Sequence, residues 1–271
     1  MATAAQPTLS AAPLAPATIA ALIDRWIYVF MAVLFIAAVL LGFVPDSVTK
    51  VGLVAGGKRP AFPLILHFHA VVTGGWLVLL LAQTSLMATG RSAGHKQLGL
   101  TALVLAPAVI IVGIILVPTM YHQAWETVHA VPGGIDAAGQ ARLDGQANVT
   151  LNQLRNGLLF GFTVLMAMRL RKSDLATHKR LMILAPVAPV MAAIARMEWL
   201  PTTIPGSPLS LELFTVLLVA PMFVWDLYRL RRIQRAYVIW FVPYVAAAVM
   251  VHIAWNAPWW QNFVPHLMGV A

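Results

Sequence analysis

The sequence predicts an all-α membrane protein, a bundle of about seven transmembrane helices. Of its 271 residues, 60% are hydrophobic and only 10% are charged, whereas soluble domains carry about 25% charged residues. The apolar residues gather in runs of about 20, the length that a helix needs to cross a bilayer. We therefore expect a multi-pass protein whose main partner is the lipid bilayer.

Seven apolar runs are candidates for membrane crossings. They cover residues 26–44, 64–87, 98–117, 150–170, 181–200, 211–228 and 237–255. The fourth opens on polar residues and the fifth contains two prolines, which often kink membrane helices. Whether these two helices are continuous is therefore open. Residues 1–22 are expected to be a disordered tail, residues 23–271 a single transmembrane domain, and residues 118–149 a long outer loop.

The basic residues set the expected orientation. They cluster after the second, fourth and sixth runs, for example at Arg169, Arg171 and Lys172. Because cytoplasmic loops of membrane proteins are rich in Lys and Arg, these loops should lie inside. The N-terminus is then cytoplasmic and the C-terminus periplasmic, as expected for a bacterial inner-membrane protein.

Composition also excludes several functions. The net charge of +9 comes from short clusters beside apolar runs, which is typical of membrane loops and argues against nucleic-acid binding. The chain has no cysteine, so disulfides, iron–sulfur clusters and covalently attached c-type haem are excluded. A metal here must use His, carboxylate or Met ligands.

The second run places polar side chains within a membrane helix. At about 100° per residue, His69, Thr73, Trp76 and Gln83 share one face, which should point into the bundle. His67 lies two residues earlier and should point elsewhere. Because ionisable residues inside a membrane are costly, they are functional candidates by default. His69 is therefore the best single site candidate.

Most other polar candidates are expected at the periplasmic side. These are His122, Glu126, His129, Asn152, Arg155, Asn156, Arg196, Glu198, Glu212 and His252. The charged ones could pair with one another, and the asparagines could form hydrogen bonds between helices. His95 and His178 are expected at the opposite, cytoplasmic boundary, near lipid headgroups. No carboxylate is expected near the middle of the membrane.

This shared depth favours a haem or metal site near the periplasmic face, with a role in redox chemistry or electron transfer and a possible redox or membrane-protein partner. In the haem hypothesis, His69 and either His252 or His122 are the axial ligands of b-type haem. Arg155 or Arg196 pairs with a propionate, and Trp76 packs on the ring.

Two alternatives belong to other functional classes. If the third helix continues past Pro118, His122, Glu126 and His129 share one face and could hold zinc, copper or iron in a membrane hydrolase. His69 and His252 are the other candidate metal ligands. The second alternative is a non-enzymatic assembly factor, channel or transporter whose polar stripes line a cavity. The substrate and the oligomeric state are open.

Three motifs resemble those of a group of bacterial inner-membrane proteins. They are H-A-x5-W-x6-Q from His69 to Gln83, G-R-x3-H-x2-L-G from Gly90 to Gly99, and H-K-R-L-M from His178 to Met182. The resemblance covers residues 63–196 and implies a polytopic inner-membrane fold without an activity. The histidines also resemble the haem ligands of cytochrome b561-like proteins, in site chemistry alone, since the two-haem spacing is not reproduced.

Overall fold

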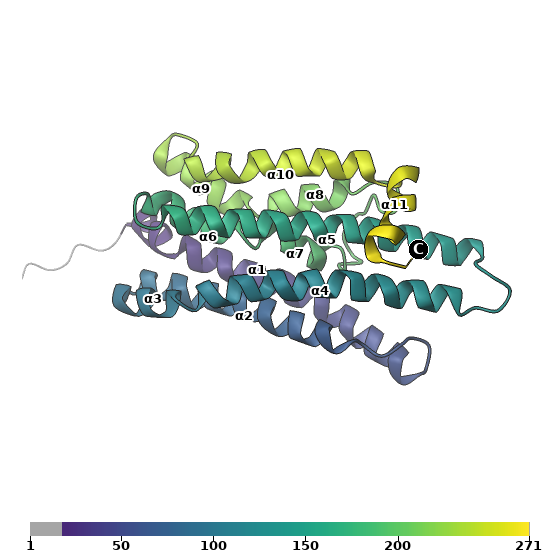
Figure 1. Ribbon diagram of the computed structural model, residues 1–271. Coiled ribbons are helices and arrows are strands. Elements are labelled where there is room, and N and C mark those ends of the chain that lie inside the picture. The colour runs from purple at the N-terminus through teal and green to yellow at the C-terminus, as the bar shows by residue number, and fades with distance from the viewer. Residues whose placement is uncertain (1–17, 271) are drawn as a thin grey trace, which may run out of the picture.

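The computed structural model describes residues 18–270, which form helices and connecting segments with no β-strand in that range (Figure 1). The all-helical prediction is confirmed. The helices are α1 (Ile19–Ala55), α2 (Leu64–Ala88), α3 (Ser92–Gly99), α4 (Ala102–His129), α5 (Ala137–Leu170), α6 (Leu175–Leu184), α7 (Val187–Ile194), α8 (Leu209–Leu217), α9 (Ala220–Leu230), α10 (Arg235–Ala254) and α11 (Pro258–Met268).

Four of the described helices are long and apolar enough to cross a membrane. They are α1, α2, α10 and the combined helix of α3 and α4, and a fifth candidate arises if α8 and α9, which are bent by 47°, form one span. Polar residues at 152, 153, 155 and 156 lower the hydropathy of α5. Length and composition therefore support four or five crossings and a membrane location.

Several helices begin or end at residues other than those that the sequence predicted. The hydroxyl of Thr18 accepts a hydrogen bond from the Ala21 amide at 3.3 Å and caps α1, so residues 19–22 are helical, while residues 1–17 lie outside the described part. Helix α4 continues past Pro118 to His129. Because α5 begins at Ala137, most of the predicted outer loop is helix.

The fifth and sixth predicted helices are both broken. Helix α6 ends at Leu184 and α7 begins at Val187, immediately after Pro186. Helices α8 and α9 meet at Val219, with Pro221 in the first turn of α9. Proline lacks the amide hydrogen that continues a helix, and it fits well in a first turn. Of the two helices whose continuity the sequence left open, the fourth is continuous within α5 and the fifth is broken. The break in the sixth was not expected.

The broken helix formed by α6 and α7 lies at the centre of the bundle. Its side chains at Leu181, Leu184, Val187 and Ala188 are completely buried. Helix α5 packs against α4 on one side and against α6 and α10 on the other, while α1 contacts α2 and α7. Figure 1 shows α2, α3 and α4 on one side of α5 and α6, and α8, α9 and α10 on the other.

Gly42 marks the closest approach of α1 to α7. A Cβ atom at this position would lie 2.2 Å from the carbonyl oxygen of Ala193. Because that neighbour is backbone, it cannot move aside without shifting the helix. A glycine is therefore required where the two helices cross.

We expect Gly42→Ala to lower the free energy of unfolding by about 1–3 kcal/mol, the usual cost of overpacking. Gly52→Ala in the same helix is the control, because nothing lies within 4 Å of its Cβ position. Thermal unfolding of both variants in detergent provides the comparison. Equal stability of the two variants would contradict the close contact.

Candidate functional site

A row of polar side chains runs along one face of α2. His69, Trp76 and Gln83 follow one another at intervals of seven residues, which is close to two helical turns. Trp76 is 3% exposed and packs edge-on against Phe160 of α5, with ring centroids 5.0 Å apart. The row therefore points into the bundle, whereas His67 is exposed, as the helical periodicity predicts.

The polar atoms of this row have no partners within residues 18–270. His69 Nδ1, Trp76 Nε1 and both polar atoms of the Gln83 amide are buried and form no hydrogen bond. Nδ1 of His95, on α3, shares this property. Since more than about 90% of buried polar groups in proteins are hydrogen-bonded, this concentration of unpaired atoms is unusual.

His178 lies in the first turn of α6, at the end of the bundle where α3 also lies. Its Nδ1 atom is 2.8 Å from the carbonyl oxygen of Ala167, which leaves Nε2 for another partner. Helix α3, which carries His95, lies at this same end of the bundle (Figure 1).

The candidate metal ligands of α4 occupy separate positions. His122 Nε2 lies 2.6 Å from the carbonyl oxygen of Met268. His129 Nδ1 lies 2.9 Å from the carbonyl oxygen of Trp125, on which its ring also stacks. Glu126 and His129 are exposed. Across the described part of the chain, no three His, Asp or Glu side chains converge on a possible metal position.

The structure does not bring His252 to His69. The side chain of His252 is exposed, and its helix, α10, packs against α5 and α6, whereas α2 packs against α1, α3 and α4. Figure 1 shows α2 and α10 on opposite sides of the bundle. The two histidines that the sequence offered as axial ligands are thus separated by the central helices.

The two arginines that were candidates for a propionate already hold carboxylates. Arg196 donates to Asp46 at 3.1 Å and lies over the ring of Phe43. Arg155, 4% exposed, forms an ion pair with Glu212 of α8. These charged residues therefore pair with one another, which the sequence left open as a possibility.

The Arg155 ion pair belongs to a larger network. Both Nε and Nη2 of Arg155 donate to Asn156 Oδ1, at 3.2 and 3.1 Å, and the hydroxyl of Tyr244 donates to the other oxygen of Glu212. Tyr244 is the tenth residue of the 20-residue helix α10. The Glu212 carboxylate therefore lies near the middle of a candidate span, so the expectation that no carboxylate lies at this depth is wrong.

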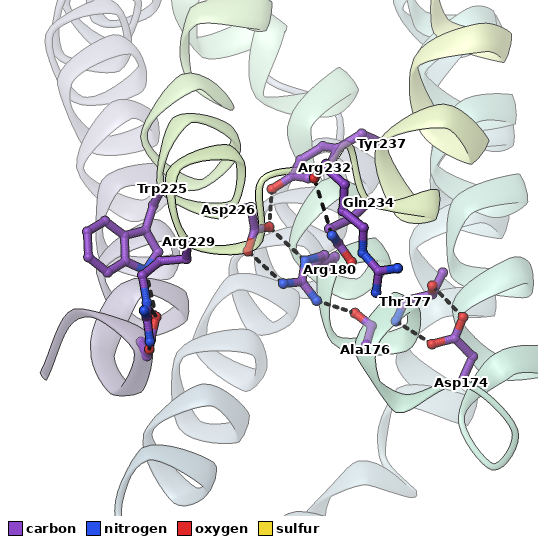
Figure 2. Close-up of polar contacts among 11 residues, drawn as sticks. Asp174, Ala176, Thr177, Arg180, Trp225, Asp226, Arg229, Arg232, Gln234 and Tyr237 are labelled. Carbon is purple, nitrogen blue, oxygen red and sulfur yellow. Dashed lines mark hydrogen bonds and ion pairs between the residues drawn. The ribbon is translucent and has the colours of Figure 1, made fainter. Parts of the chain in front are cut away.

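A second network of the same composition was missed by sequence reasoning (Figure 2). Arg180 of α6 donates to both oxygens of Asp226, at 2.7 and 2.6 Å, and Tyr237 donates to Asp226 at 2.6 Å. Arg180 and Asp226 are 5% and 6% exposed. The available signal was the spacing of Tyr237 and Tyr244, which places both tyrosines on one face of α10.

Comparison with protein families, curated proteins and solved structures found no match to this chain. Function is therefore inferred from the geometry alone. The two features that require an explanation are the unpaired row on α2 and the paired networks on α10.

Removing one member of the Arg180–Asp226 pair should destabilise the protein strongly. We expect Asp226→Leu to cost about 3–5 kcal/mol, because it leaves a guanidinium buried without a counter-charge. The double variant Arg180→Met, Asp226→Leu should recover most of that loss. Asp24→Leu, which breaks the exposed pair with Arg229, should have little effect in the same unfolding assay. A cost for Asp226→Leu no larger than that for Asp24→Leu would refute this reasoning.

Proposed function

We propose that this chain is a seven-pass inner-membrane protein that binds b-type haem through His95 and His178 and takes part in electron transfer. The observation that carries the proposal is the row of buried, unpaired polar atoms on α2 and α3. Five of the ten such atoms within residues 18–270 belong to His69, Trp76, Gln83 and His95. A bound group that offers partners to part of this row would account for them.

The chemistry of His178 supports a ligand role. A metal-bound imidazole usually donates its other ring nitrogen to a carbonyl or carboxylate, which orients the ring and fixes the tautomer. His178 has this arrangement, with Nδ1 on the Ala167 carbonyl. Arg171, in the turn that joins α5 to α6, is a basic residue that would pair with a propionate.

Haem fits the ligand set better than a bare metal ion does. The porphyrin supplies four nitrogen ligands, so the protein needs to supply only two, whereas zinc sites generally use three or four protein ligands. No group of three His, Asp or Glu side chains is available in the described range. We therefore propose the site at the end of α2 that carries Gln83, in place of the periplasmic end that the sequence predicted. The metal-dependent hydrolase has weaker support, because His122, Glu126 and His129 do not converge on one position within the described residues.

Seven crossings follow if α5 and the broken helix α6–α7 also span the membrane. Helix α5 has 34 residues, enough to cross, and α6 and α7 together occupy the centre of the bundle. The basic residues Arg171 and Lys172 lie in the turn after α5. The positive-inside rule therefore supports a cytoplasmic position for this turn and for the α9 end of the bundle.

Because the chain contains no cysteine, single cysteines can report the topology cleanly. In intact cells, a membrane-impermeant maleimide should label Gly145→Cys, in the exposed N-terminal part of α5, and Thr202→Cys, between α7 and α8. Ser173→Cys, between α5 and α6, should react only after the membrane is permeabilised. Labelling of all three from one side would contradict the two additional crossings.

Protein purified in detergent after expression with a haem precursor should show a Soret band and stoichiometric iron. We expect His178→Ala and His95→Ala to lose both, because each removes an axial ligand. His252→Ala and His67→Ala, which alter exposed histidines, are the matched controls and should retain them. A wild-type protein without a Soret band, or equal loss in the controls, would refute the proposal.

A further inference from the structure

The two networks on α10 are linked into a longer column of polar groups. Tyr237 and Tyr244 are separated by seven residues, so they share a face and lie roughly 10 Å apart along the helix. Trp240 lies between them and stacks on Tyr244, with ring centroids 4.7 Å apart. Each tyrosine donates to a buried carboxylate, Asp226 or Glu212. The column thus contains two acids within the membrane region.

The column continues towards the α11 end along α5. Asn148, Asn152 and Asn156 recur every four residues, which places them on neighbouring positions of one helical face. Asn156 contacts Arg155. Asn148, 3% exposed, donates to Asn256 at 2.6 Å and accepts from Gln261 at 3.3 Å. Polar groups therefore extend from Glu212 to the segment around α11.

Both ends of the column approach the surface. At the α11 end, Gln261 and Asp144 help to line a cavity of about 350 Å³, which is large enough for several water molecules. At the α9 end, Arg180 donates to the carbonyl of Ala176, an exposed residue. Figure 2 shows Arg232 and Gln234 beside Arg180. The buried acids lie between two accessible ends.

The gaps in the column contain polar atoms without partners. Asn152 Oδ1 lies between the Asn148 and Asn156 levels, and Trp240 Nε1 lies between the two tyrosines. Neither atom forms a hydrogen bond within residues 18–270. Buried water commonly satisfies such atoms, and a water molecule at each position would connect neighbouring hydrogen-bonding groups.

We propose that this column conducts protons across the membrane. A proton that enters from the cavity binds the Glu212 carboxylate. The Tyr244 hydroxyl, whose hydrogen points to Glu212, turns towards water beside Trp240 and gives that hydrogen to it, while the Tyr244 oxygen accepts the proton from Glu212. The Tyr237 oxygen takes that proton and passes its own hydrogen to Asp226, which releases one proton at the α9 end. Hydroxyl groups both accept and donate, so one proton enters and one leaves.

Two features favour protons over larger ions. The acids are paired with Arg155 and Arg180, so the column carries compensated charge and offers no free anionic site to a metal cation. Its central groups are also almost fully buried, at 2% exposure for Tyr244 and Trp240, which leaves little space for a hydrated ion. Chains of acidic groups in membranes commonly serve as proton relays.

The test uses the purified full-length protein in liposomes that contain a fluorescent pH indicator. A potassium diffusion potential set with valinomycin should drive proton uptake faster than in protein-free liposomes. Tyr244→Phe and Tyr237→Phe should each lower the initial rate by about tenfold or more, because each removes one proton-transfer group. Both substitutions leave the ion pairs in place, so the variants should remain folded, as thermal unfolding will verify.

Two variants serve as matched controls. Tyr228→Phe changes an exposed tyrosine of α9, and Thr150→Val removes a buried hydroxyl that bonds only to its own helix at Gln146. Both should retain the wild-type rate. A wild-type rate equal to that of protein-free liposomes, or folded Tyr→Phe variants with unchanged rates, would overturn the proposal. Haem content, read from the Soret band, is measured separately, so failure of either proposal is distinguishable from failure of the other.

Discussion

The ion pair between Arg155 and Glu212 is the contact on which the second half of the bundle depends. A guanidinium and a carboxylate removed from water are each costly alone and tolerable only together. Their pairing brings α5 to α8, and the hydroxyl of Tyr244 adds α10 to the same point. Arg155 Nη2 also contacts the sulfur of Met191, on α7. Four helices therefore converge on one buried charge pair.

The break between α8 and α9, next to Pro221, lies between the two buried carboxylates, Glu212 and Asp226. In a straight helix, Glu212 and Asp226 would lie about 21 Å apart, whereas the tyrosines that contact them are only about 10 Å apart along α10. The 47° bend shortens that separation by only about 2 Å, so the side chains bridge most of the difference. A helix broken inside a membrane is tolerated where its freed backbone groups are buried in protein, and Val219, at the break, is 5% exposed.

Much of the fold could be predicted from the sequence because it follows from local patterns. Apolar runs predicted helices, and the 3.6-residue period separated exposed His67 from half-buried His69. The sequence did not reveal which helices meet. Arg180 and Asp226 are 46 residues apart, and no periodicity links them. Glu212 was expected at the periplasmic side because it lies at the start of the sixth apolar run, but it accepts a hydrogen bond from Tyr244, in the middle of another helix.

The candidate site was harder to predict for the same reason. His69 and His252 were paired as candidate ligands because both were expected at the same depth in the membrane. Depth along the membrane normal does not determine which side of a bundle a residue occupies. The central helix α6–α7, with Leu181, Leu184 and Val187 completely buried, divides the molecule. The sequence predicted His178 as an interfacial residue and did not reveal the contact between its Nδ1 atom and the Ala167 carbonyl.

The two halves of the bundle satisfy their polar groups in different ways, and this difference carries the functional argument. Around α10, Arg155, Glu212, Arg180 and Asp226 have charged partners within the described residues, and Trp240 Nε1 has no hydrogen-bond partner there. Around α2, Gln83 has neither a donor nor an acceptor partner, although packing holds its helix in place. Buried water or a bound group can supply the partners of such atoms. The unpaired row is therefore where the proposed ligand would bind, whereas the paired column needs no ligand.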